Sequence, residues 1–291
     1  MTVSMAARGT IVLAALVTMA GVSVMAHADT ADQQASATAC AKEETEYATS
    51  IYEYYATRFD GEAAVEEAGI KAHRGLNWPY REYETDWEFM RVTAKKEPSE
   101  DYDARFDRIV LEPMSKALQP LLDAKTKRIN SVEESRLEKV EMKNAYDSCK
   151  GKKPLCEKEF NKYIEKSDPI AKDLEQKEKS WLPMTGGQGE GLESEKASDE
   201  WVQKLGDVYK EYKTSIEGDE LWDAMVKAVQ DDDKAAHAAA QKKFLAGADA
   251  DLNKTIDDFV TARESAHDAM VDAMITFEDQ LKALTKCIQP T

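Results

Sequence analysis

Apolar residues recur every three or four positions along most of the chain, and stretches that alternate apolar with polar residues are missing. A period near 3.6 predicts amphipathic helices, whereas a period of two would predict strands. We therefore expect an all-α protein, built as an elongated helical bundle that disulfides staple together and that ends in a long C-terminal helix.

The most regular pattern lies between residues 251 and 288. Alternate spacings of four and three predict one long helix with a continuous seam. That seam contains Ile256, Val260, Arg263, His267, Met270, Met274, Phe277, Leu281, Leu284 and Ile288. A helix of about 55 Å, at 1.5 Å per residue, needs a partner of similar length. We expect that partner to be the region 99–149.

The N-terminal half contains several residues that commonly interrupt helices. A first helix is expected over residues 39–59, and Gly69 then marks the end of a short acidic segment. Asn77-Trp78-Pro79 is a further interruption, because proline cannot donate the hydrogen bond that a helix requires. The pattern therefore predicts a break near Pro79 and a separate short helix over 80–95.

Glycines cluster within residues 184–197, which we interpret as a Gly-rich loop. The loop would separate an N-terminal helical region, 29–183, from a C-terminal helical region, 198–291, that packs on the first within one composite domain. The loop lacks the Gly-Lys-Ser/Thr sequence of a phosphate-binding loop. It therefore predicts a connection and no nucleotide site.

The first 28 residues have the three parts of a secretory signal peptide. Arg8 precedes the apolar run from Ile11 to Val24, and Ala26-His27-Ala28 places small residues at a cleavage site. No second long apolar run follows. We expect a secreted or periplasmic protein whose mature chain does not insert into a membrane.

Four cysteines follow the expected signal peptide: Cys40, Cys149, Cys156 and Cys287. An even number in an exported chain indicates disulfides, and four cysteines allow three pairings. Cys149 and Cys156 flank a turn-like stretch, so we expect them to staple a helical hairpin. Cys40 would then pair with Cys287. No metal site is predicted, because neither a Cys-x-x-Cys pair nor a histidine at ligand spacing accompanies them.

The chain is strongly acidic. It has 39 basic and 56 acidic side chains and a net charge of −17, which becomes −18 when Arg8 is removed with the signal peptide. Such a charge disfavours nucleic acid and anionic membranes, whose phosphates would be repelled. It suits solubility, or a protein partner that is basic.

Two positions of the C-terminal seam are polar. Arg263 and His267 lie four residues apart, on the same side of the expected helix. A buried arginine needs a carboxylate partner, so an acidic residue should face them. They are either a polar layer that fixes the register of the helices or a pocket for a ligand. No cofactor is predicted, since haem ligands normally come from different helices.

A second group of candidate residues lies where the pattern of the N-terminal half is irregular. It comprises His73, Arg74, Trp78, Tyr80 and Trp87. Aromatic and basic side chains of this kind are common anchors in protein interfaces. They pack the ends of helical bundles equally well, and both interpretations stay open.

No catalytic motif is present. The chain has no Gly-x-Ser-x-Gly turn and no His-Glu-x-x-His pair, and its cysteines are expected to be paired. We therefore predict a protein that is not an enzyme and that binds another macromolecule, as an adaptor, an inhibitor or a surface-recognition module. The alternative is a small-ligand or cofactor carrier with its pocket near Arg263 and His267.

Overall fold

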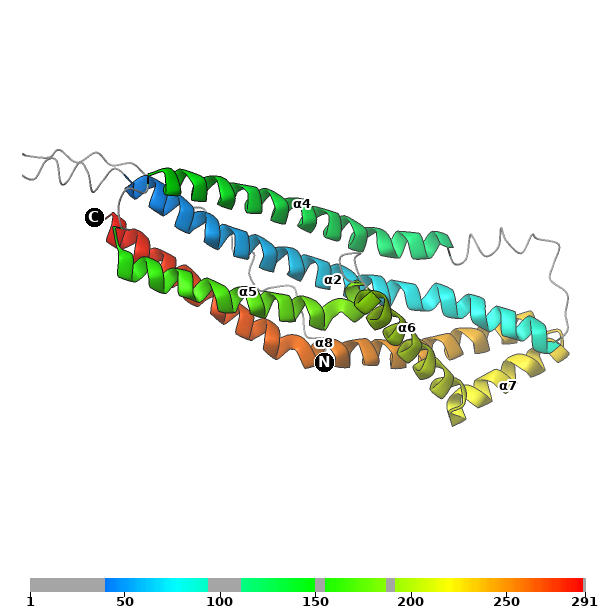
Figure 1. Ribbon diagram of the computed structural model, residues 1–291. Coiled ribbons are helices and arrows are strands. Elements are labelled where there is room, and N and C mark those ends of the chain that lie inside the picture. Colours follow the sequence, from blue (N-terminus) through cyan, green and yellow to red (C-terminus); the bar gives the residue numbers. More distant parts are fainter. Residues whose placement is uncertain (1–39, 94–110, 150–154, 187–191, 290–291) are drawn as a thin grey trace, which may run out of the picture. The chain divides into compact units, whose positions relative to one another are not determined.

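The structure is a computed structural model that describes residues 40–93, 111–149, 155–186 and 192–289, and only the backbone of residues 77–93 and 192–195. These residues form six helices and no strand (Figure 1). The helices are α2 (Ala41–Thr93), α4 (Glu112–Ser148), α5 (Glu157–Thr185), α6 (Leu192–Lys213), α7 (Ile216–Gln230) and α8 (Lys234–Ile288). The expected all-α, disulfide-linked bundle is confirmed. The signal peptide predicted over 1–28 lies outside the described residues.

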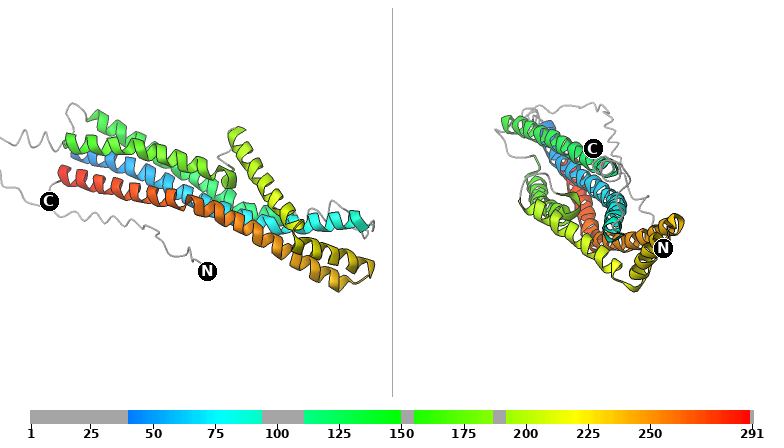
Figure 2. Two further views of the ribbon diagram at one scale, coloured as in Figure 1. Left: turned by 90° about the horizontal axis from the view of Figure 1, so that it is seen from below. Right: turned by 90° about the vertical axis from the view of Figure 1, so that its right-hand side faces the viewer.

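Residues 40–289 belong to one compact unit, in which α2 packs against α4, α5 and α8. In two of the three views α4 lies along one side of α2, while α5 and α8 lie on the other (Figures 1 and 2). The long helix α8 packs on α2, α5, α6 and α7. The expectation that its partner would be the region 99–149 is therefore wrong, because α4 packs on α2 instead.

The predicted seam of α8 is confirmed. Ile256, Val260, Met270, Met274, Phe277, Leu284 and Ile288 are buried, and the remaining seam positions are half-buried. Phe277 stacks on Tyr163 of α5, with 4.6 Å between the ring centroids. The helix begins earlier than expected, at Lys234, where the carboxylate of Asp233 accepts hydrogen bonds from two amides of the first turn.

Helix α2 has no break where the sequence predicted one, and it continues through Pro79 to Thr93. Its glycines serve close packing between helices. A Cβ atom on Gly61 would lie 2.6 Å from Cγ of Arg128, and one on Gly69 would lie 3.1 Å from the carbonyl oxygen of Met184. These glycines therefore admit α4 and the end of α5 against α2, and do not end the helix.

The connection between α5 and α6 is shorter than the predicted loop of 184–197. Helix α5 continues to Thr185, and Gly186 adopts the left-handed conformation, with φ of 63°, that ends many helices. Helix α6 already begins at Leu192. The expected loop is therefore helical at both ends, and residues 187–191 lie outside the described part.

The disulfides join Cys40 to Cys149 and Cys156 to Cys287, with Cα–Cα distances of 5.8 and 6.1 Å. The expected pairs, Cys149 with Cys156 and Cys40 with Cys287, are wrong. The start of α2 lies beside the end of α4, and the start of α5 lies beside the end of α8. Each bond therefore links two neighbouring helices across the bundle. The spacing of the cysteines along the sequence does not specify which helices are neighbours.

Candidate functional site

A layer of buried charges crosses the interface of α2, α4 and α5. Glu62 and Glu66 of α2, Arg128 of α4 and Lys177 of α5 are each at most 5% exposed. Arg128 pairs with Glu62 and, at 3.4 Å, with Glu178 of α5. Lys177 pairs with Glu66. Four buried charges in two opposite pairs are neutral together, as burial requires.

These charges were missed in the sequence because acidic and basic residues are frequent throughout it. One signal was available. Glu62 and Glu66 are four residues apart and flank Val65, a buried residue of the same helix. Burial lowers the pKa of the Lys177 ammonium and raises that of the Glu66 carboxyl, while each charge opposes the shift of the other. Each of these four charges has an opposite charge beside it on another helix, so the layer links α2, α4 and α5.

Arg263 faces main-chain oxygens, not the carboxylate that the sequence led us to expect. Its guanidinium donates hydrogen bonds of 2.8 Å to the carbonyl oxygens of Ser180 in α5 and Phe259 in α8. The same group lies 3.3 Å from the centroid of the Phe259 ring. The expected acidic partner is wrong because a carbonyl at this distance satisfies a half-buried guanidinium.

His267 lies one turn further along α8 and packs against Phe59 of α2, with 5.5 Å between ring centroids. The Lys177 ammonium lies 5.5 Å from the same Phe59 ring. Burial, and then the positive charge of Lys177, lower the pKa of His267. His267 therefore borders the buried charge layer, while Arg263 contacts the carbonyl of Ser180 on α5.

His73 and Arg74 point in different directions. The Nε2 atom of His73 lies 3.1 Å from the carbonyl oxygen of Met184, so this nitrogen carries the hydrogen. The His73 ring also meets Trp201 of α6 edge to face, at 6.1 Å. Arg74 is more exposed and pairs with Asp257 of α8. Both residues join helices within the bundle.

The side chains of Trp78, Tyr80 and Trp87 lie outside the described residues. Their backbone continues α2, which removes the irregular segment on which the sequence argument depended. Their role as binding anchors stays a prediction.

We expect His73 to make the protein less stable in mild acid. Burial lowers its pKa below the ordinary value of about 6.5. As the pH falls below about 6.5, the unfolded chain binds a proton that folded His73 does not, so stability is lost until the pH passes the lower pKa of the folded state. Urea titrations between pH 7.5 and 5 should show a smaller loss for His73→Gln than for the parent chain. Equal losses would contradict the prediction.

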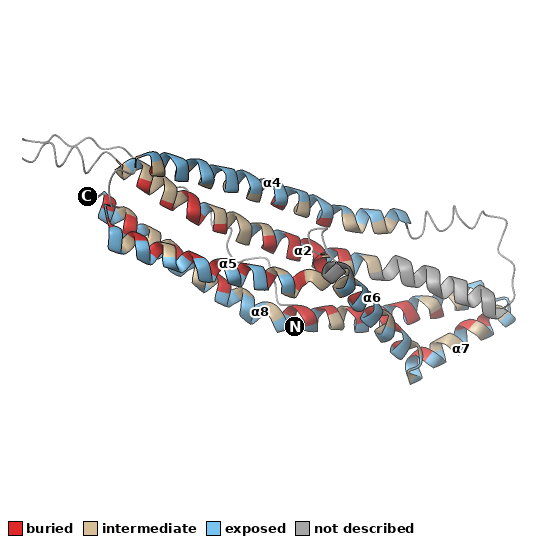
Figure 3. Ribbon diagram, viewed as in Figure 1, coloured by how far each residue is buried: buried red, intermediate tan, exposed pale blue. Residues whose placement is uncertain are grey.

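Helix α4 carries an exposed face that the sequence analysis did not identify. We call it the α4 face, and it comprises Leu111, Ser115, Leu118, Gln119, Leu122, Thr126, Ile129, Glu133, Arg136, Leu137, Val140 and Asn144, which share one side at about 3.6 residues per turn. Leu122, Ile129, Leu137 and Val140 are between 42% and 55% exposed. Figure 3 shows the outer side of α4 as almost continuously exposed.

Charge is nearly absent from the α4 face, although charged residues make up 33% of the chain. Glu133 and Arg136 on it bind each other through two hydrogen bonds of 2.7 Å, and Asp147, which follows on the same side near the end of α4, pairs with Lys143. Scattered apolar residues on a surface are ordinary, whereas a long apolar row marks an interaction surface. The face was missed because α4 buries few apolar residues and therefore has a weak helical period.

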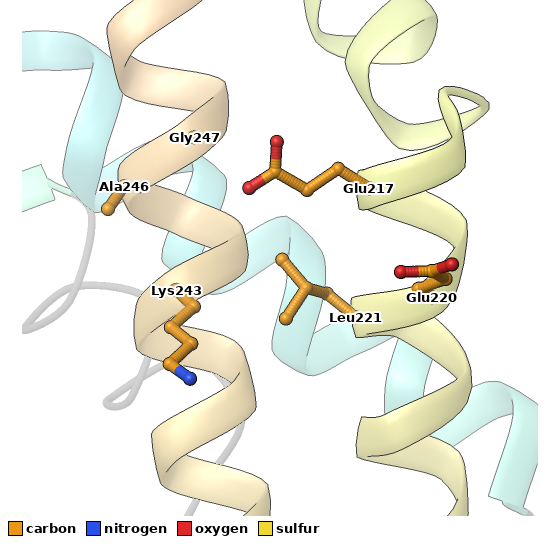
Figure 4. Close-up of a pocket in the computed structure, with 6 residues that line it drawn as sticks. All are labelled: Glu217, Glu220, Leu221, Lys243, Ala246 and Gly247. Carbon is orange, nitrogen blue, oxygen red and sulfur yellow. The ribbon is translucent and has the colours of Figure 1, made fainter.

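A shallow groove lies between α7 and α8. Glu217, Glu220 and Leu221 line it from α7, and Lys243, Ala246 and Gly247 line it from α8 (Figure 4). It is open to solvent, its three charged side chains are exposed, and that of Glu217 extends from α7 toward α8 (Figure 4). Sites for small ligands are usually enclosed and mostly apolar, unlike this groove.

Metal-ligating groups come together at one place in the described residues, where Cys156, Glu159 and Cys287 lie close to one another. Both cysteines are joined in a disulfide, so neither offers a thiolate to a metal. Among the described helices, none contains a stretch long and apolar enough to cross a membrane.

Comparisons with known proteins give no relative. No protein-family model, no curated protein and no solved structure matches the chain.

Proposed function

We propose that this chain is an exported protein that binds another protein through the α4 face. The observation that carries the proposal is the exposed apolar row of Leu122, Ile129, Leu137 and Val140 on a helix that packs mainly on α2 along its other side. Each of these side chains gains free energy when a partner removes it from water, at roughly 25 cal/mol per Å².

Two further features support an extracellular binding role. Four cysteines form two disulfides that link helices across the bundle, and such bonds persist in oxidising compartments. The acidic net charge disfavours nucleic acid, and the nearly neutral α4 face is where a protein partner meets the least repulsion. An adaptor or inhibitor needs a site of this kind.

The geometry gives less support to a small-ligand site at Arg263 and His267. Arg263 already donates to two carbonyl oxygens and lies over Phe259, and His267 packs on Phe59. A ligand there would have to displace these contacts. The α4 face requires no such displacement, because its side chains already contact solvent.

Photo-crosslinking tests the proposal. Benzoylphenylalanine is introduced at Leu122 on the α4 face, at Trp87, and at Glu134, an exposed position on the other side of α4. We expect protein adducts from Leu122 but not from Glu134 when the labelled chain is irradiated in the extracellular fluid of its source. Adducts from Trp87 alone would indicate that the binding surface lies on α2 and not on α4. Equal adducts from Leu122 and Glu134, or none at any position, would contradict a binding role for the α4 face.

A further inference from the structure

Four of the five apolar residues that accompany Ile129 on the α4 face are arranged almost symmetrically about it, whereas the position that matches Leu111 is Asp147. Leu118, which is half-buried and packs on one edge against the cluster of Val65, Ala68, Ala72 and Leu121, precedes Ile129 by 11 positions, and Val140 follows it by 11. Leu122 precedes it by 7, and Leu137 follows it by 8. Both offsets correspond to whole turns or nearly so. The face therefore presents nearly the same apolar pattern when the helix is read in either direction.

A surface with this property can bind a copy of itself. In a twofold dimer the same patch is used on both molecules, and a residue i that contacts residue j receives the reciprocal contact. An antiparallel pair of α4 helices with its axis at Ile129 would place Leu118 at the height of Val140 of the second copy. Leu122 would lie near the height of Leu137 of the second copy. Ile129 would meet Ile129.

The charges of the α4 face agree with this arrangement. Ser115, Gln119 and Thr126 are uncharged, and Glu133 is already neutralised by Arg136 of the same helix. Two copies can therefore approach along this face without placing like charges opposite each other. A basic partner would have no acidic row to bind here, although the rest of the molecule is acidic.

We propose that the partner of the α4 face is a second copy of this chain, which forms an antiparallel twofold dimer centred on Ile129. The inference rests on the proposed function, because it names the occupant of the same surface. It also fixes the effect of salt. Each copy carries a net charge of −17, or −18 without the expected signal peptide, so the copies repel at long range and salt screens that repulsion. Dimerisation should tighten as salt is added.

Sedimentation velocity on the purified chain over a range of concentrations tests the dimer. We expect a concentration-dependent dimer whose dissociation constant falls between 0.05 and about 0.5 M NaCl. Ile129→Asp should weaken it on the order of tenfold or more, since two carboxylates would be buried at the axis. Ala145→Asp adds the same charge at an exposed α4 position away from the face and should leave the dimer intact. A chain that stays monomeric at every salt concentration would overturn the inference.

Crosslinking between isotopically distinct copies tests the direction of pairing. With benzoylphenylalanine at Leu118 in one population, adducts should fall within residues 137–144 of the other population. Adducts within residues 111–122 would indicate a parallel pair and overturn the twofold axis at Ile129. The dimer and the binding function of the α4 face can be rejected independently of each other. A monomeric chain that still crosslinks a different protein from Leu122 rejects the dimer and keeps the binding function.

Discussion

Replacing Arg128 with methionine is expected to lower the free energy of unfolding by about 3–5 kcal/mol, because Glu62 would then be a buried charge without its partner. Arg128 is buried and pairs with both Glu62 and Glu178, and its aliphatic stem packs on Gly61 of α2. Methionine preserves most of that packing and removes the charge. Urea unfolding, followed by the helical circular dichroism signal, measures the loss.

A second variant separates lost charge from lost packing. Glu62→Leu combined with Arg128→Met removes the Glu62–Arg128 pair and should recover most of the stability, because replacing a buried pair with apolar residues is often neutral or favourable. Arg136→Met is the matched control on the same helix, since its partner Glu133 is exposed, and it should change little. If the double variant were no more stable than Arg128→Met, the loss would come from packing and not from an unpaired carboxylate.

Removing the Cys156–Cys287 disulfide with a pair of alanines is expected to cost roughly 4–5 kcal/mol in the chain-entropy model. The bond closes a loop with a sequence separation of 131, and the Cys40–Cys149 bond closes one of 109. The two loops do not overlap along the chain, so the losses from removing each bond should add. The denaturation midpoints of the two single-bond variants and of the variant without both bonds measure this additivity.

The pairing itself is read from the mature protein by peptide mapping without reduction. We expect linked peptides that contain Cys40 with Cys149 and Cys156 with Cys287. A peptide that links Cys149 to Cys156 would restore the hairpin pairing that the sequence suggested. It would also contradict the structure, in which α4 ends beside the start of α2 and α5 begins beside the end of α8.

The seam of α8 was predictable because a repeat of three and four positions requires one face of a helix to be buried. The same repeat contains no information about which helix covers that face. For this reason α4 was chosen as the partner by its length, whereas the structure places α2, α5, α6 and α7 there. Disulfide pairing has the same limit, since it depends on which helix ends are neighbours.

Errors in α2 had a different physical origin. Glycine and proline within a helical pattern were interpreted as breaks, which is their commonest local effect. In α2 the gain from close contact outweighs the local cost of glycine, because Gly61 admits Arg128 and Gly69 admits the backbone at Met184. Of the candidate site residues, Arg263 and His267 were placed on the buried seam correctly. Their partners could not be known without the positions of α5 and α2.

The positions of the two disulfides determine how the protein carries mechanical load. Tension applied between the chain at Cys40 and the chain at Cys287 passes through the first sulfur bridge, the short segment from Cys149 to Cys156, and the second bridge. The six described helices lie within two loops, each closed by one of the disulfides, and these loops are not part of the path along which the force passes. Pulling on the ends therefore stretches only a few covalent bonds and leaves the helices unstrained, until a reductant cuts a bridge and transfers the force to them.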